Sequence, residues 1–155
     1  MTRIQIAALT ILSLANLIGQ TNPMIGAWKL NLAKSKFVPG PPPQSQMTTI
    51  ESVSNGTKHT TTGIAADGST ISYTYTTAVD GKYEPIMGKG PSGADSIAVK
   101  HIDPNTTEAT YKKDDKVVQT SRTVVSKDGK ARTVTSDGTG SSGQATHTVT
   151  VYDRQ

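Results

Sequence analysis

The chain lacks cysteine and has few large apolar side chains. Its 155 residues contain no Cys, one Trp and one Phe, which excludes a disulfide-stabilised mini-protein and a Cys-ligated metal centre. After residue 20, Leu30 and Leu32 are the only leucines, whereas Thr and Ser are abundant throughout. The length corresponds to one domain. The shortage of large apolar side chains favours a small β-structure over a helical bundle.

The sequence also lacks a catalytic motif and a concentrated patch of charge. The formal net charge is +4, but Lys and Asp are mixed within 112–116 and 127–130, and no basic run is interleaved with aromatic residues. A nucleic-acid-binding face concentrates Lys and Arg on one surface, so we expect no nucleic-acid partner. No serine lies in a Gly-x-Ser-x-Gly elbow, and no paired carboxylates occupy adjacent inward strand positions. We therefore expect that the protein is not an enzyme.

Residues 1–20 have the organisation of a secretory signal peptide. Met1-Thr2-Arg3 supplies positive charge, Ile4–Ile18 is mostly apolar, and either Ser13-Leu14-Ala15 or the Gly19-Gln20 junction offers a cleavage site. The apolar stretch is too short and too polar for a comfortable membrane span. An amphipathic first helix and an uncleaved anchor are the alternatives. We expect a secreted or periplasmic protein with no integral membrane span after signal removal.

The remaining domain, residues 21–155, consists of short segments separated by tight turns. Five dipeptides of the kind that adopts positive φ in hairpins are Asn55-Gly56, Asp67-Gly68, Asp80-Gly81, Asp128-Gly129 and Asp137-Gly138. Segments rich in Thr, Val, Ile and Tyr predict about ten strands, namely Gly26–Leu32, Met47–Ser54, Thr57–Ala65, Ser69–Thr77, Lys82–Ile86, Ser96–Ile102, Thr106–Lys112, Lys116–Val125, Lys130–Ser136 and Gln144–Tyr152. No segment after residue 20 has helix periodicity over three turns.

The alternation of residue types predicts that these strands have an inner and an outer face. Ile71, Tyr73 and Tyr75 alternate with Ser or Thr, as half-buried strands do. Short connections allow only antiparallel neighbours, so we expect a meander. A meander of this size closes because closure removes exposed edges. The predicted fold class is therefore all-β, a single up-and-down antiparallel β-barrel of about 8–10 strands.

Two segments interrupt the strand pattern. Lys34–Gln46 contains Pro39-Gly40-Pro41-Pro42-Pro43, which cannot donate ladder hydrogen bonds and is expected to cross an end or an outer face of the barrel. Gly88–Asp95 is expected to be a flexible loop. Its Gly-x-Gly-x-x-Gly spacing lacks the βαβ context of a dinucleotide site, and we expect no cofactor.

The segment Gly26-Ala27-Trp28-Lys29-Leu30 carries a family resemblance. A Gly-x-Trp in the first strand of a one-domain meander, with a last strand ending in Val151-Tyr152, resembles the calycin superfamily of lipocalins and fatty-acid-binding proteins. The run from Gly26 to Phe37, followed by Pro-Gly-Pro-Pro-Pro, is similar to exported bacterial proteins described as lipocalin-like. This resemblance implies a lipocalin-like barrel, with Trp28 as a structural plug at the closed end and Arg154 as a candidate to stack on it.

The chain also departs from the fatty-acid-binding proteins. They have two lid helices after the first strand, where this chain has the proline segment. They carry an Arg-x-Tyr carboxylate anchor on the last strand, where this chain has Thr150-Val151-Tyr152. We therefore do not expect fatty-acid binding of that type.

The candidate ligand-binding residues are Tyr73, Tyr75, Tyr111 and Arg122. The scarcity of large apolar residues suggests that packing leaves space in the barrel, where the tyrosines would supply aromatic walls with hydroxyl ends. If Arg122 points inward, it is a buried cation that needs an anionic partner, such as a ligand carboxylate or phosphate. In the alternative, Val117, Gln119, Ser121 and Thr123 point inward and Arg122 faces solvent.

The three histidines, His59, His101 and His147, lie on three different predicted strands. Nothing in the sequence brings them together, and we expect no metal site. The predicted function is that of an exported protein binding a small, partly hydrophobic molecule inside its barrel. The alternative is an envelope interaction or structural protein with a filled barrel. A cavity of roughly 300 Å³ or more would favour ligand binding.

Overall fold

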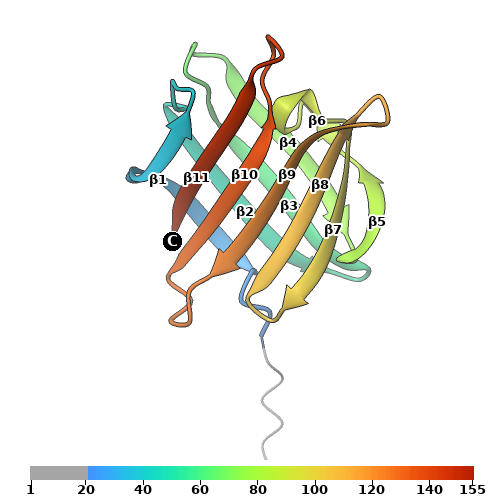
Figure 1. Ribbon diagram of the computed structural model, residues 1–155. Helices are drawn as coiled ribbons and strands as arrows, with labels where there is room; N and C mark the ends of the chain where they lie inside the picture. The colour runs from blue at the N-terminus through green and yellow to red at the C-terminus, as the bar shows by residue number, and fades with distance from the viewer. Residues whose placement is uncertain (1–20) are drawn as a thin grey trace, which may run out of the picture.

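The computed structural model describes residues 21–155, most of which lie in one antiparallel β-sheet curled into a barrel (Figure 1). One short 3-10 helix, η1, spans Pro91–Gly93. The eleven strands of the described residues are β1 Gly26–Val38, β2 Ser45–Val53, β3 Gly56–Ile64, β4 Thr70–Thr77, β5 Asp80–Pro85, β6 Met87–Gly88, β7 Ser96–Asp103, β8 Thr106–Lys113, β9 Lys116–Val125, β10 Ala131–Thr139 and β11 Ala145–Arg154.

Segment 80–88 brings the two ends of the sheet together. The strand order is β5-β7-β8-β9-β10-β11-β1-β2-β3-β4-β6. β5 pairs with β7, as in Glu84 opposite Ile97, and β6 pairs with β4, as in Gly88 opposite Tyr73. One continuous piece of chain thus contributes to both edges of the sheet. The result is a nearly closed barrel, which confirms the predicted all-β, up-and-down fold.

The backbone pairing of β1 with β2 stops well before β1 ends. Its pairing with β2 covers Gly26–Lys29 only, and its pairing with β11 shifts register between Asn31 and Lys36. The hydroxyl of Ser35 donates to the Asn31 carbonyl at 2.7 Å and accepts from the Val151 N–H at 2.9 Å. These bonds satisfy backbone groups that the ladder leaves free. The irregularity carries the proline segment that follows to one end of the barrel.

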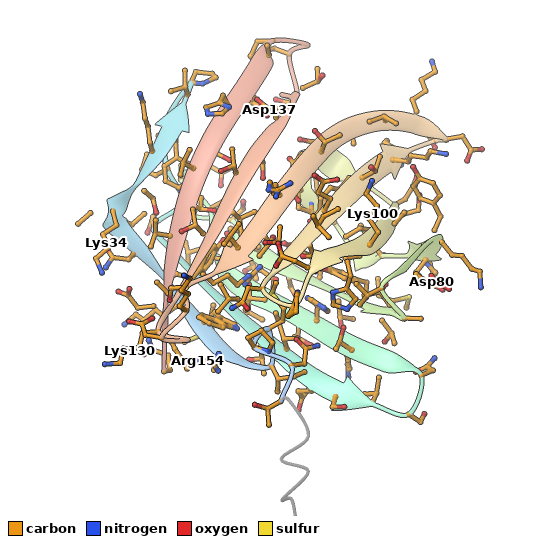
Figure 2. The ribbon with its side chains drawn as sticks, turned by 60° about the horizontal axis from the view of Figure 1, so that its bottom comes forward. Lys34, Asp80, Lys100, Lys130, Asp137 and Arg154 are labelled. Carbon is orange, nitrogen blue, oxygen red and sulfur yellow. The ribbon has the colours of Figure 1, made fainter. Side chains whose placement is uncertain are left out.

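Trp28 plugs the opposite, closed end. It is fully buried, and its indole Nε1 donates to the Met24 carbonyl at 2.9 Å. The guanidinium of Arg154 lies 4.2 Å from the centre of the Trp28 ring, and Figure 2 shows Arg154 at this end of the molecule. The apolar cluster around the indole contains Met24, Trp28, Leu30, Ile50, Val125 and Tyr152. The arrangement implied for Trp28 and Arg154 is therefore present.

A second apolar cluster lies under β7 and β8, near segment 80–88. Its buried members are Ile86, Ala94, Ile97, Val99 and Tyr111. The cluster around Trp28 occupies the closed end of the barrel, and the second cluster occupies one wall. Other kinds of side chain line the rest of the interior. Within residues 21–155, no helix has the length and apolarity needed to cross a membrane.

The turn prediction at Asp137-Gly138 is wrong. Both residues are paired within β10, Asp137 opposite His147 and Gly138 opposite Thr146. The turn that follows runs from Gly140 to Gly143, where the Gly143 N–H donates to the Gly140 carbonyl. Gly138 is needed for close approach, because a Cβ there would meet the Val118 carbonyl oxygen at 2.9 Å.

Candidate functional site

The barrel contains an interior cavity of about 680 Å³. Its mouth lies at the end opposite Trp28, where the lining comes from the proline segment, the β3–β4 turn, the loop around η1 and the β10–β11 turn. These connections gather at the top of Figure 1. Around the mouth, Phe37, Pro41, Pro43, Ile71 and Pro91 provide apolar surface. The cavity is therefore a pocket whose entrance is built by loops.

Four residues form the floor of this cavity. Tyr75, Tyr111, Arg132 and Val134 also line a second void of about 50 Å³ towards the closed end, so they separate the two spaces. Tyr75 is on β4, Tyr111 on β8, and Arg132 and Val134 are on β10. The floor therefore combines two phenol rings and one cation that come from three different strands.

The three tyrosines predicted for the site all line the cavity. Tyr73 and Tyr75 follow each other on the inner face of β4, and Tyr111 lies on β8. Burial raises the pKa of each hydroxyl above its ordinary value. The phenols consequently stay protonated at neutral pH, and each can donate one hydrogen bond.

Arg132 is the cation of the interior. Its Nε and Nη1 atoms are buried and have no hydrogen-bond partner. Its guanidinium carbon lies 5.0 Å from the ring centre of Tyr152, the residue directly opposite it on β11. A buried guanidinium without hydrogen-bond acceptors is unfavourable. This side chain is therefore the strongest chemical feature of the cavity.

His59 lies beside the floor as a neutral side chain. Its ring stacks on Tyr75 with centroids 4.6 Å apart, its Nδ1 is 3.1 Å from the Tyr75 hydroxyl and its Nε2 is 3.1 Å from the Thr57 hydroxyl. Burial, and secondly the charge of Arg132, lower the pKa of His59 from 6.5 to about 3. At neutral pH His59 thus orients Tyr75 and adds no positive charge.

The structure places Arg122 on the outer face, so the inward alternative for this residue is wrong. Ser121 and Val125 of β9 are buried, and strand alternation therefore turns Arg122 outward. The Arg122 side chain is 51% exposed, and its Nη1 donates to Oε1 of Glu108 at 2.9 Å. Glu108 is its direct neighbour on β8. Arg122 therefore has a carboxylate partner and takes no part in the interior site.

Sequence reasoning missed Arg132 because β10 shows almost no alternation. Four of its nine residues are Thr or Ser, and Val134 is its only large apolar residue. Val134 does mark the inner face, and Arg132, two positions away, shares that face. That single valine is the signal that could have revealed the interior cation.

The histidines and acidic residues do not form a metal site in the described part of the chain, where no group of three or more potential ligands occurs. His59 is inside, whereas His147 lies on the surface with its Nδ1 2.7 Å from Oδ1 of Asp137. Asp67 and Asp128 each accept the backbone N–H two residues later within a turn, and Asp80 accepts the Lys82 N–H at the start of β5. These carboxylates therefore support local backbone structure.

Comparisons with known proteins identify the fold. No protein-family model and no curated protein sequence matches the chain. Among solved structures, zebrafish ileal bile acid-binding protein in complex with cholic acid is similar over 86% of this chain and 99% of its own, with 13% identity and a TM-score of 0.50. Lobster apocrustacyanin A1 is similar over 88% of this chain and 63% of its own, with 13% identity and a TM-score of 0.45.

The first of these likenesses concerns the fold alone, since the sequence identity is low. It agrees with the nearly closed barrel that the described residues form. The chain thus shares the fold of the zebrafish protein, a nearly closed, up-and-down antiparallel β-barrel.

Proposed function

We propose that this protein is an exported, non-enzymatic binding protein that holds a small, partly hydrophobic molecule inside its barrel. The observation that carries the proposal is the interior cavity of about 680 Å³, which lies within the size range of small-molecule sites. The apolar mouth and the polar floor suit a ligand with one apolar and one polar part. A filled barrel, which the alternative role as an interaction or structural protein requires, does not fit such a cavity.

The solved structures give this proposal limited support. The zebrafish protein, which has the same kind of barrel, is described as a bile acid-binding protein in complex with cholic acid. That likeness supports a barrel able to hold a ligand, and the nature of this protein's ligand has to come from its own side chains.

Native mass spectrometry tests the proposal. The protein would be purified without detergent from its export compartment, and any bound molecule would be released by denaturation. Thr148 lines the cavity, so Thr148→Trp should fill it and abolish the adduct. His147 is the exposed neighbour on the same strand, and His147→Trp, the matched control, should keep the adduct. Equal adducts in both variants would contradict binding inside the barrel.

Export is a separate part of the proposal, and it rests on residues 1–20, which lie outside the described residues. Their charged, apolar and small-residue sequence supports a cleaved signal. Expression of the full chain in a bacterium, followed by fractionation and determination of the new N-terminus, tests this. We expect a mature chain beginning near residue 20 in the periplasm or medium. Uncleaved protein in the cytoplasm would refute export.

A further inference from the structure

The strand-borne wall of the cavity contains one cation and no carboxylate. Among residues 21–155, Arg132 is the only Lys, Arg, Asp or Glu that a strand contributes to the lining. Asp67 and Lys89 line only the mouth, and both are exposed to solvent. The depressed pKa of His59 keeps that ring neutral. Within the part of the chain that the structure describes, the deep part of the cavity therefore has a net charge of +1 and no carboxylate.

The surroundings leave the guanidinium of Arg132 available to a ligand. The aromatic ring of Tyr152 lies next to it, and an aromatic ring interacts with a cation without accepting conventional hydrogen bonds from its N–H groups. Nε and Nη1 have no acceptor. Tyr111, which shares the floor, remains protonated and can donate a further hydrogen bond to an anion bound there.

Most of the remaining strand-borne lining is polar. Its hydroxyl and amide side chains, apart from the tyrosines, are Gln46, Thr48, Thr61, Thr70, Gln119, Ser136, Thr148 and Thr150. Some are paired with each other: the Thr48 and Thr61 hydroxyls are 3.1 Å apart, and the Gln46 amide donates to the Tyr152 hydroxyl at 2.9 Å. A long alkyl chain would deprive such groups of water and offer no hydrogen bond in return. Hydroxyl or carbonyl groups on a ligand would replace that water.

We propose that the preferred ligand is a monoanion whose acid group binds Arg132 at the cavity floor and whose body carries hydroxyl or carbonyl groups. This inference rests on the proposed function and defines its ligand class. One negative charge neutralises Arg132, whereas a dianion leaves a buried charge unpaired. The polar lining disfavours a straight-chain fatty acid. The apolar part of the ligand lies towards Phe37 and Ile71 at the mouth.

Two fluorescent probes that differ in one charged group test the role of Arg132. 1-Anilinonaphthalene-8-sulfonate is a monoanion, and N-phenyl-1-naphthylamine is the same ring system without the sulfonate. We expect the wild-type protein to bind the anion about tenfold more tightly or better. Arg132→Met should abolish that preference and leave binding of the neutral probe unchanged. Arg122→Met, which removes a cation from the outer face, should behave as wild type.

Competition with matched acids tests the body of the ligand. We expect 3,4-dihydroxycinnamate to displace the anionic probe at a concentration about three- to tenfold lower than cinnamate, because its hydroxyls hydrogen-bond to the wall. Decanoate should compete less well than either aromatic acid. A better displacement by decanoate would overturn the polar-body part of the inference.

The outcomes separate this inference from the proposed function. If Thr148→Trp leaves the binding of both probes unchanged, the probes bind elsewhere and the proposed function fails. If Thr148→Trp blocks both probes but Arg132→Met retains the anion preference, the cavity binds ligands and the inference is overturned. Should Arg132→Met fail to fold, a wild-type preference for the neutral probe would overturn the inference by itself, and Arg132→Lys should keep a preference for the anion.

Discussion

Arg154 clamps the closed end of the barrel around Trp28. Its guanidinium lies 4.2 Å from the centre of the indole and donates hydrogen bonds to the carbonyls of Pro23, Ile25 and Gly129. One side chain near the C-terminus thereby joins the start of the domain to the β9–β10 turn. It also explains the glycine of the Gly-x-Trp motif: Gly26 has a φ of +136°, and a Cβ there would collide with Nη1 of Arg154.

Loss of the Arg154 clamp should destabilise the barrel. Arg154→Ala removes three charge-assisted hydrogen bonds and the stacking on Trp28, and we expect the free energy of unfolding to fall by about 3 kcal/mol. Urea unfolding followed by the fluorescence of the single tryptophan measures this. Arg154→Lys should restore only part of the loss, because an ammonium lacks the planar fork. Lys130→Ala, an exposed change at the same end, is the control; equal values for Arg154→Ala and Lys130→Ala would disprove the clamp.

Replacing Arg132 by an apolar residue should stabilise the ligand-free protein. The unpartnered Nε and Nη1 atoms make this side chain costly without an anion. Arg132→Met should therefore raise the free energy of unfolding by about 1–3 kcal/mol. Urea denaturation of ligand-free protein measures it, with Arg122→Met as the matched change on the outer face. A drop of several kcal/mol would mean that Arg132 stabilises the barrel itself.

The partly buried His59 should make stability depend on pH in the mildly acidic range. The unfolded chain takes up a proton at this residue below pH 6.5, whereas the folded chain does so only near its lowered pKa of about 3. The stability is fully present above pH 6.5 and is lost as the pH falls from 6.5 towards 3. At pH 5 the loss is about 2 kcal/mol.

Two histidine variants check this dependence by urea unfolding at pH 7.5 and pH 5. His59→Gln should lose the difference between the two pH values, and His147→Gln, a change on the surface, should keep it. The carboxyl groups of Asp67, Asp103 and Asp153 have pKa values below their ordinary 3.8, so they remain ionised at pH 5. A His59→Gln variant with unchanged pH dependence would rule out the assignment.

The tyrosines of the interior should resist ionisation in alkaline solution. Burial raises the pKa of four of them, Tyr73, Tyr75, Tyr111 and Tyr152. The unfolded chain loses phenolic protons near pH 10 and the folded chain at higher pH, so stability present below pH 10 is lost as the pH rises. At pH 11 the native protein should show a much smaller absorbance increase at 295 nm than the urea-unfolded protein. If the native and the urea-unfolded protein titrated at the same pH, the cavity would expose these hydroxyls to water.

Much of the fold could be predicted from the sequence, because strands and turns depend on local interactions. The Asp67-Gly68 and Asp128-Gly129 turns are closed by aspartate side chains that bind the backbone two residues later. Alternation along Ile71, Tyr73 and Tyr75 identified an inner face, and the tyrosines do line the cavity. The proline segment was expected at an end or an outer face, and Pro41 and Pro43 lie at the cavity mouth.

What only the tertiary structure decided is which arginine lies inside and whether the interior is filled. Arg122 and Arg132 both lie in strands rich in Thr and Ser, residues that occupy either face of a sheet at similar cost, so the sequence pattern leaves the register undetermined. Arg122 points outward because it pairs with Glu108 on β8 and because its strand buries Ser121 and Val125 on the opposite face. Arg132 points inward because it lies on the same face of β10 as Val134, which lines the cavity. The cavity arises because nine strands and segment 80–88 enclose more volume than these small side chains occupy. That balance exists only once the ring has closed.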